Sequence, residues 1–506
     1  MVHYRSTRGG VRGLSFEQAV LTGLAADRGL LVPEVNEFPT LPADALENYN
    51  STTFRAEEVA PVVKVTDQML VLELFHGPTF AFKDIALQFL GNLFEFFLKR
   101  KNEALPAGAS KHQITVENVE VFILFPEGRV SAIQQRQMTT VLDQNIHNVA
   151  VKGTFDDCQA IVKDLFANAE FKAKYNLGAV NSINFARILA QIVYYVWAYF
   201  RAREQGVSGE VAFSVPTGNF GDILAGFYAK KLGVPIGKLI VATNENDILH
   251  RFFSTGKYHR HDIEHTISPS MDICVSSNFE RYLFALSGEN HDILRGWMQG
   301  FEQTGELSIS GELLTKAQDE MASYAVLQKE VCSTIAEYKK VHQYLFDPHS
   351  AIGAAAAMHF GQENLADKPS SAVVVVGTAH YGKFLPVVSK ALGVAESEIQ
   401  QHPILKALES LATRLSVANN SSATVAEHIR KTVAKKNQKA CSDCFSLWTS
   451  APTESANKDR NSHSSHNLIL RRRSKKERDK IKAIYALVIG QVGDKKYTKK
   501  FLAPNV

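Results

Sequence analysis

Several features are scarce in this 506-residue sequence. Five cysteines are too few for a disulfide framework, and their odd number leaves at least one free thiol. No apolar run reaches the roughly 18 residues that a membrane helix needs, and the first 13 residues lack the apolar core of a signal peptide. We therefore expect a cytoplasmic protein that does not enter a membrane.

The two parts of the chain differ in charge. Residues 430–506 hold 19 Lys and Arg against 6 Asp and Glu, a charge of +13, so the other 429 residues carry −9 of the net +4. The basic part includes RRRSKKERDK at residues 471–480, and blocks of like charge are usually solvated. We expect residues 412–506 to form a basic, disordered tail, with one short helix or strand within 482–492.

Nucleic-acid binding by this tail remains a weaker alternative, as does a metal site at Cys441, Cys444, His463 and His466, whose spacing does not fit a zinc finger.

Short apolar runs alternate with longer amphipathic stretches from the first predicted helix to about Leu408. The predicted strands cover residues 119–125, 149–151, 211–215, 238–242 and 372–376, and the predicted helices cover residues 15–27, 85–98, 187–201 and 222–232. Alternation of this kind is typical of βαβ units, in which helices cover both faces of a parallel sheet. The predicted fold is α/β with open, mostly parallel sheets, preceded by an N-terminal helical region.

Three motifs could carry chemistry. Lys83 ends HGPTFAFK directly before an apolar helical stretch, where a helix N-terminus and an apolar wall both favour the neutral amine that imine formation needs. Residues 215–222 (VPTGNFGD) turn from a strand into a helix and could hold a phosphate. Thr378 follows a predicted strand, at the edge where α/β sheets bind ligands. Taken singly, each motif is also compatible with a surface lysine or a plain turn.

Together the three motifs match what an enzyme dependent on pyridoxal 5'-phosphate requires: groups for the aldehyde, the phosphate and the ring nitrogen. A hydroxyl rather than a carboxylate at the nitrogen suits elimination more than transamination.

The sequence resembles the threonine synthase family from about Tyr4 to Leu411. The resemblance is carried by ordered motifs: STRG at 6–9, HGPTFAFKD at 76–84, PEGRVS at 126–131, QMTT at 137–140, NSINFAR at 181–187, PTGNFGD at 216–222, TNEN at 243–246, SMDI at 270–273, DPHS at 347–350 and TAH at 378–380. It implies pyridoxal-phosphate fold type II, the tryptophan-synthase-β-like fold, with an N-terminal domain at 1–75 and a catalytic core of two α/β subdomains at 76–411.

The resemblance also implies an activity, conversion of O-phospho-L-homoserine and water to L-threonine and phosphate, and roles for single residues. Lys83 is implied as the catalytic lysine that forms a Schiff base with the cofactor. The implied cofactor ligands are Gly218, Asn219, Phe220, Gly221, Asp222 and, at the ring nitrogen, Thr378. The implied ligands of the substrate phosphate are Asn181, Ser182 and Arg187, and no metal is implied.

One block of the family pattern is missing. The family carries a Ser/Thr/Gly-rich stretch and a helix between a strand like residues 114–116 and the strand at 119–125, and the stretch grips the substrate carboxylate. Here Val116 runs directly into Glu117, and two residues cannot supply the crossover of a dozen or more that parallel neighbours need. Coding sequence has been skipped, or the chain is a divergent one that binds the cofactor without turnover. A serine or threonine dehydratase is a further alternative.

Overall fold

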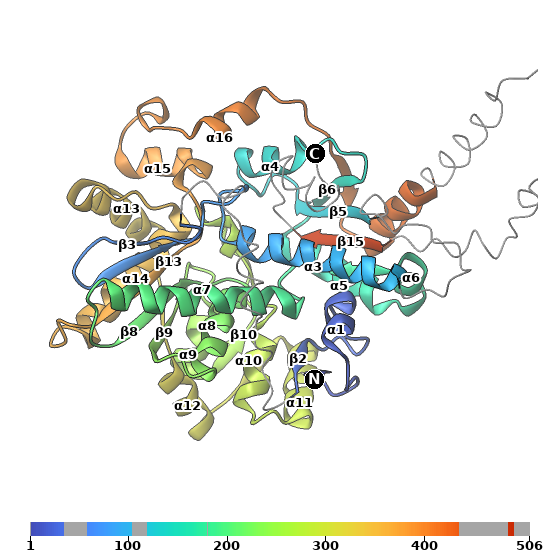
Figure 1. The fold of residues 1–506 in the computed structure, drawn as a ribbon, viewed down its shortest axis with the longest axis horizontal. Coiled ribbons are helices and arrows are strands. Elements are labelled where there is room, and N and C mark those ends of the chain that lie inside the picture. Colours follow the sequence, from blue (N-terminus) through green and yellow to red (C-terminus); the bar gives the residue numbers. More distant parts are fainter. Residues whose placement is uncertain (1, 35–57, 104–118, 180, 435–483, 490–506) are drawn as a thin grey trace, which may run out of the picture.

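A computed structural model describes residues 2–34, 58–103, 119–179, 181–434 and 484–489. Their strands form two large sheets and two small ribbons, and helices surround both sheets (Figure 1). The ribbons pair β1 (Tyr4–Ser6) with β2 (Leu31–Pro33) and β10 (Lys257–His259) with β11 (Glu306–Ser308). Within these described residues, no helix is both long and apolar enough to cross a membrane.

The larger sheet has six strands. In spatial order they are β12 (Met321–Ala325), β9 (Ile236–Thr243), β8 (Val211–Pro216), β13 (Ala372–Gly377), β4 (Met69–Glu73) and β3 (Val62–Lys64). All neighbours are parallel except β3 and β4. Every residue of β8 and of β13 is buried, as expected for strands that helices cover on both faces.

The smaller sheet has five parallel strands. In spatial order they are β14 (Ser416–Asn419), β6 (Ile146–Lys152), β5 (Val119–Pro126), β15 (Ile484–Ile489) and β7 (Leu177–Ala179).

The α-helices that surround the sheets vary in length from one turn to more than five. They are α1 (Phe16–Thr22), α3 (Lys83–Glu103), α4 (Ala132–Thr139), α5 (Phe155–Ala167), α6 (Ala169–Tyr175), α7 (Phe185–Glu204), α8 (Gly221–Lys231), α9 (Ile248–Thr255), α10 (Phe279–Leu286), α11 (His291–Thr304), α12 (Glu312–Glu320), α13 (Gln328–His342), α14 (Pro348–Asn364), α15 (Leu385–Leu392) and α16 (Pro403–Ala407). The long helices α3 and α7 pack against each other across the middle of the molecule (Figure 1).

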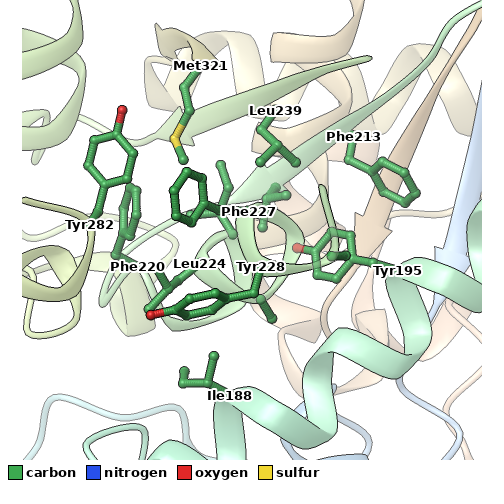
Figure 2. Packing of buried hydrophobic residues seen from close by; sticks show 14 of the residues in the cluster. Ile188, Tyr195, Phe213, Phe220, Leu224, Phe227, Tyr228, Leu239, Tyr282 and Met321 are labelled. Atoms are coloured by element: carbon green, nitrogen blue, oxygen red, sulfur yellow. The ribbon is translucent and has the colours of Figure 1, made fainter. Parts of the chain in front are cut away.

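The core beside the larger sheet is rich in aromatic side chains around α8. Phe220 at its start and Phe227 within it contact Tyr282 of α10, and Tyr195 of α7 packs against Phe213 of β8 (Figure 2). Gly226 faces Tyr195 so closely that a Cβ atom there would lie 2.8 Å from the ring. Helix α8 is thus held at a fixed distance from α7, and with it the turn that precedes α8.

The α/β prediction is confirmed. The predicted strands at 119–125, 149–151, 211–215, 238–242 and 372–376 fall within β5, β6, β8, β9 and β13. The predicted helices at 85–98, 187–201 and 222–232 fall within α3, α7 and α8, apart from Leu232 after the end of α8. The first predicted helix is too long. It begins at Phe16, where Ser15 and Gln18 form a capping box, but ends at Gly23, whose φ of 68° breaks it and whose Cβ would lie 2.9 Å from the Ala179 Cβ.

The domain limits of the structure differ from the predicted ones. Strands β3 and β4 lie before residue 75 yet belong to the larger sheet. Beyond residue 411, β14 pairs with β6, and residues 422–434 are helical, with Val425 and Ile429 fully buried. Burial of such side chains contributes about 1.5–3 kcal/mol each. Residues 416–434 are therefore part of the globular core and not of a disordered tail.

Strand β15 comes from the C-terminal segment but lies in the middle of the smaller sheet. It pairs in parallel with β5 over its whole length, from Ile484 beside Val119 to Ile489 beside Leu124, and on its other side with β7 (Figure 1). The short apolar stretch predicted at 482–492 is thus a strand. Without it, the structure shows no strand to join β5 to β7 among the described residues.

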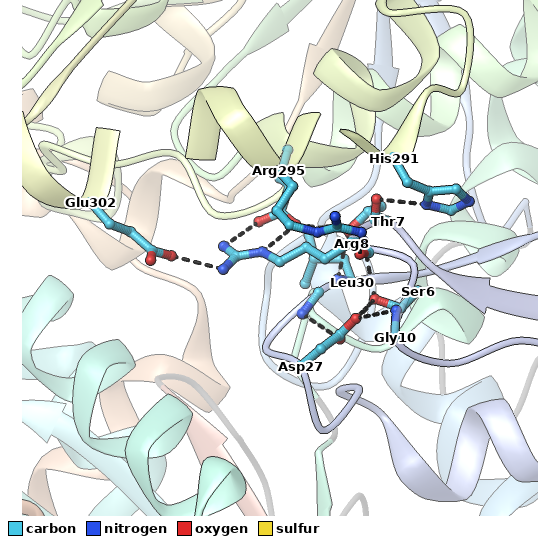
Figure 3. A network of polar contacts seen from close by, with 11 residues as sticks. Ser6, Thr7, Arg8, Gly10, Asp27, Leu30, His291, Arg295 and Glu302 are labelled. Carbon is cyan, nitrogen blue, oxygen red and sulfur yellow. Dashed lines mark hydrogen bonds and ion pairs between the residues drawn. The ribbon is translucent and has the colours of Figure 1, made fainter. Parts of the chain in front are cut away.

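The STRG motif clamps the N-terminus to α10 and α11. Thr7 donates a hydrogen bond of 2.7 Å to Glu280, and Arg8 forms ion pairs with Glu280 and Glu302 (Figure 3). Ser6 donates to the carboxylate of Asp27, and burial of Glu280 makes these contacts strong. The motif therefore has a structural role.

We predict that a chain ending at residue 434 is less stable than the full chain, because it leaves the edges of β5 and β7 unpaired. Its thermal unfolding midpoint should fall by several degrees. The matched control ends at Ile489. It lacks only the last 17 residues and keeps β15, so it should unfold like the full chain. Equal midpoints for all three chains would contradict the assigned place of β15.

Candidate active site

A single cavity of about 1020 Å³ brings together all ten residues that the sequence analysis singles out. They come from four separate segments of the chain, and they are Lys83, Asn181, Ser182, Arg187, Gly218, Asn219, Phe220, Gly221, Asp222 and Thr378. The cavity's lining comes from the turn before α3, the segment between β7 and α7, the turn between β8 and α8, and the end of β13.

Lys83 is the first residue of α3, as expected, and a tight turn precedes it. The carboxylate of the fully buried Asp84 accepts hydrogen bonds from the backbone N–H of Thr79 at 2.8 Å and from its hydroxyl at 2.6 Å. Gly77 passes so close to Asp84 that a Cβ atom there would lie 2.4 Å from the Asp84 Cβ. The HGPTFAFKD motif is therefore a folded clasp, and Asp84 is its centre.

The surroundings of Lys83 disfavour its charged form. Burial, together with the nearby positive charges of Arg187 and Lys383, lowers the pKa of Lys83 to about 7, although Asp84 acts in the opposite direction. Near neutral pH a substantial fraction of the amine is therefore unprotonated, which is the form that attacks a carbonyl group.

The clasp is joined to the end of β13. The N–H of Phe82 donates to the carbonyl of Thr378 at 2.8 Å, and the N–H of His380 donates to the carbonyl of Phe80 at 3.1 Å. On its other side, the N–H of Thr378 donates to the Ser350 hydroxyl at the start of α14. These contacts fix Thr378 and Lys83 in neighbouring positions of the cavity wall, 295 residues apart in sequence.

The turn between β8 and α8 forms an anion cradle. Phe220 has a φ of 60°, which is rare for a bulky side chain, and it turns the chain directly into the N-terminus of α8. The first N–H groups of a helix have no partner within the helix, and they attract anions. A Cβ atom at Gly218 would lie 3.3 Å from the backbone of Met271 and Ser270, so the cradle has little room for a side chain there.

Residues 276–278 hold the cradle from behind. Ser276 donates its hydroxyl hydrogen to the carbonyl of Gly218 at 2.7 Å, and Asn278 donates from its side chain to the carbonyl of Asn219 at 3.1 Å. The side chain of Asn219 accepts from Gln159 and Ser277 and is thereby oriented. The cradle's carbonyl groups are thus occupied by the protein.

Asp222 points toward α7. Its Oδ1 accepts hydrogen bonds from the hydroxyls of Tyr194 at 2.6 Å and Tyr195 at 2.8 Å. Burial raises the pKa of Asp222 to about 6, while the two tyrosines and Arg187 act in the opposite direction. Its predicted place in the phosphate loop therefore rests on its backbone, since its side chain ties α8 to α7.

Asn181, Ser182 and Arg187 line the cavity next to the cradle, since a Cβ atom at Gly221 would lie 3.3 Å from the Ser182 Cβ. Arg187 is buried in the first turn of α7, and Asn181 orders the segment before it by accepting from the N–H of Ile183. The fully buried Arg281 supports this segment, because it donates to the carbonyl of Ile183 at 2.6 Å and to that of Ser182 at 3.3 Å. A guanidinium with neutral donors beside it is suited to bind a phosphate group.

These residues fit pyridoxal phosphate. The cofactor carries an aldehyde, a phosphate and a ring nitrogen, and the cavity offers a lysine with a lowered pKa, a cradle with little room for a Cβ atom and a buried threonine hydroxyl. Lys83 would hold the aldehyde, residues 218–222 the phosphate, and Thr378 the ring nitrogen.

Several residues of the site escape the sequence analysis. Four of them contact segments far away in sequence, so no local pattern predicts their roles: Gln159, Ser276, Asn278 and Arg281. Lys383 lines the cavity beside Lys83. Its position shortly after TAH, at the end of a strand, is a signal that could have been used.

Two predictions fall outside the described residues. The junction of Val116 and Glu117 and the expected strand at 114–116 lie within 104–118, and the Cys441, Cys444, His463 and His466 set lies within 435–483. In the part of the chain that the structure describes, no cluster of His, Cys, Asp and Glu is suited to hold a metal ion.

The fold and the cavity define the class of protein, a pyridoxal-phosphate-dependent enzyme of fold type II. The pyridoxal-phosphate-dependent enzyme family model matches residues 115–378. Models of the threonine synthase N terminus and of the threonine synthase C-terminal region match residues 3–65 and 350–429. The chain belongs to the threonine synthase family, whose C-terminal region here extends past residue 411.

Characterised relatives agree. Threonine synthase of Schizosaccharomyces pombe is 42% identical over 77% of this chain and 89% of its own length. That of Saccharomyces cerevisiae is 41% identical over 81% of this chain and 93% of its own length.

Solved structures give the same result. Threonine synthase from yeast matches with a TM-score of 0.73 and 38% identity, over 86% of this chain and 99% of that one. The pyridoxal-phosphate-bound enzyme from Brucella melitensis matches with a TM-score of 0.71 and 37% identity, over 85% of this chain and 99% of that one.

We predict that Gly218→Ala weakens the binding of pyridoxal phosphate by at least about tenfold, because the new methyl group crowds Met271 and Ser270 and displaces the cradle. The affinity is measured by fluorescence titration of the cofactor-free protein. Gly361→Ala is the matched control, since a Cβ atom at Gly361 in α14 meets nothing within 4 Å. An unchanged affinity in Gly218→Ala would show that the phosphate binds elsewhere.

Proposed function

We propose that this cavity is the active site of a threonine synthase that converts O-phospho-L-homoserine and water to L-threonine and phosphate. The observation that carries the proposal is the presence of two anion-binding groups in one cavity. The cradle at 218–222 serves the cofactor's phosphate, and Asn181, Ser182 and Arg187 are left for a phosphate of the substrate. A substrate with its own phosphate accounts for both.

Lys83 is the proton carrier of the proposed reaction. Pyridoxal phosphate, when bound, supplies a sink for the electron pair of the substrate's α carbon. The amine of Lys83 takes the α proton and moves protons among the α, β and γ carbons. Its pKa of about 7 lies near the working pH, where a group can both accept and release a proton.

Arg187 stabilises the leaving group. As the bond between the γ carbon and oxygen breaks, the bond's electron pair leaves with phosphate, and the buried guanidinium holds the charge that develops there. Water then adds its oxygen at the β carbon to give the threonine hydroxyl. Thr378, being neutral, leaves the ring nitrogen less protonated than a carboxylate would, which suits elimination.

A second candidate is a chain that binds the cofactor without turnover. The direct junction of Val116 and Glu117 favours it, because the family's stretch that grips the substrate carboxylate has no counterpart in the sequence. We propose that the chain as it stands keeps its cofactor site and lacks this grip. A serine or threonine dehydratase is less well supported, since its substrate has no phosphate for Arg187 to bind.

The remaining assignments are also proposals. We propose O-phospho-L-homoserine as the small-molecule partner, a cytoplasmic location and no nucleic-acid partner.

We predict that Arg187→Ala lowers phosphate release from O-phospho-L-homoserine by about 100-fold or more, because a charged hydrogen-bond donor to the leaving group is lost. Cofactor binding should fall far less than turnover, because the cradle at 218–222 is left intact. Arg201→Ala, on the same helix but outside the cavity lining, is the control. Unchanged turnover in Arg187→Ala would exclude a phosphorylated substrate at this wall.

We also predict the effect of inserting the missing block between Val116 and Glu117, with the sequence that the Saccharomyces cerevisiae relative has there. The insertion should raise phosphate release by at least about 100-fold. Substrate orientation is worth several kcal/mol of the reaction barrier. The inserted and original chains should bind pyridoxal phosphate alike. Equal turnover of the two chains would show that the block is not needed.

A further inference from the structure

The second lysine of the cavity has no part in the reaction described so far. Lys383 is the last residue of the short 3₁₀ helix η3 (Tyr381–Lys383), which begins four residues after the end of β13. It is almost completely buried, with 1% of its surface exposed. Lysine is rarely buried to this extent unless its amine has partners. This lysine therefore needs a structural or chemical reason.

The amine of Lys383 reaches the clasp that carries Lys83. It donates a hydrogen bond of 2.8 Å to the carbonyl of Thr79, the residue whose N–H and hydroxyl are bound by Asp84. Gln137 of α4 donates to the same carbonyl at 2.9 Å. The backbone carbonyl of Lys383 accepts from the Ser131 hydroxyl at 3.0 Å, which fixes the segment on α4. Lys383 thus links the clasp to α4 and to the end of β13.

Lys383 also adds a charge to the cavity. Three charged groups act on Lys83 from three directions: Arg187 of α7 and Lys383 disfavour its protonation, and Asp84 favours it. The other titratable groups of the lining are Arg129, Arg136, Asp222, His265, Asp272, His349, Glu396 and Glu409. Burial raises the pKa of Asp84, and the hydrogen bonds from Thr79 and the charge of Lys383 oppose that shift. One positive charge thus favours the ionised form of Asp84 and disfavours the charged form of Lys83.

We propose that Lys383 is a positioning residue of the active site, which holds the clasp through Thr79 and places its ammonium group in the cavity wall that also carries Lys83, the residue that attaches the cofactor. Lys383 neither attaches the cofactor nor moves a proton of the substrate. The inference rests on the proposed role of Lys83, but its test uses the cofactor-free protein, so that it does not depend on which substrate the enzyme takes.

The experiment measures the pH at which Lys83 becomes reactive. Cofactor-free full-length protein is labelled briefly with acetic anhydride between pH 5 and pH 10, and acetylation of Lys83 is followed by peptide mass spectrometry. In the unaltered chain the midpoint should lie near pH 7, since burial and the two cations lower the pKa of Lys83 to about 7.

Lys383→Gln removes the charge but keeps an N–H donor for Thr79. We expect the Lys83 midpoint to rise and labelling at pH 7 to fall by about threefold to tenfold, since one pKa unit changes the neutral fraction about tenfold below the midpoint. Lys383→Arg, which keeps the charge, should restore the original midpoint. Lys390→Gln, at the exposed end of α15, is the matched control and should change nothing.

Two results would overturn the inference. One is a Lys83 midpoint in Lys383→Gln that equals that of the unaltered chain while the thermal unfolding transition is retained. The other result applies if Lys383→Gln does not fold. Lys383→Arg keeps the charge, so a raised Lys83 midpoint in that variant would show that charge is not what Lys383 supplies. Loss of phosphate release with a normal Lys83 midpoint would count against the proposed reaction of the enzyme and not against this role.

Discussion

The active site depends on one pair of backbone contacts, those that join residues 80–82 to residues 378–380. The N–H of Phe82 donates to the carbonyl of Thr378, and the N–H of His380 donates to that of Phe80. The segment before α3 therefore lies beside the residues that directly follow β13. Three residues of the active site are placed by this junction. Lys83 directly follows the first segment, Thr378 lies within the second, and Lys383 comes three residues after the second. Because backbone groups form it, the junction does not depend on the side chains that react.

Several charged side chains are buried around that junction. Asp84, Arg187, Asp222, Arg281 and Lys383 are all buried. Isolated charges are costly in an apolar interior, and each of these groups is therefore hydrogen-bonded or faces an opposite charge. The result is a rigid wall whose electrostatic potential is fixed before any ligand arrives, which is how enzymes make charge stabilisation effective.

The sequence alone predicts a large part of this arrangement, for physical reasons. The buried strands are continuous Val and Ile runs, and the capping box of Ser15 and Gln18 is a local signal, so both are found by pattern. The cavity residues Lys83, Gly218 and Thr378 were found because each lies at a strand end or helix start that the motifs mark. The ends of elements are less predictable: Gly23 ends α1 with a φ of 68°, at a place where Ala179, 156 positions away, leaves no room for a Cβ atom. Likewise, Arg281 supports carbonyl groups nearly 100 residues away, and the central place of β15 depends on which edges other strands leave open.

The N-terminal clamp has a consequence for synthesis of the chain. Arg8 and its partner Glu302 are separated by 294 positions, and Thr7 and Glu280 by 273. A ribosome that adds about 5–20 residues per second needs tens of seconds to cover that distance. During that time β1 and the STRG motif exist without the helices that bind them, so the first residues made wait for Glu302 before they reach all their final contacts. A chaperone that acts on the nascent chain would meet this segment in an open state, and the clamp can close before strands β12 to β15 have been made.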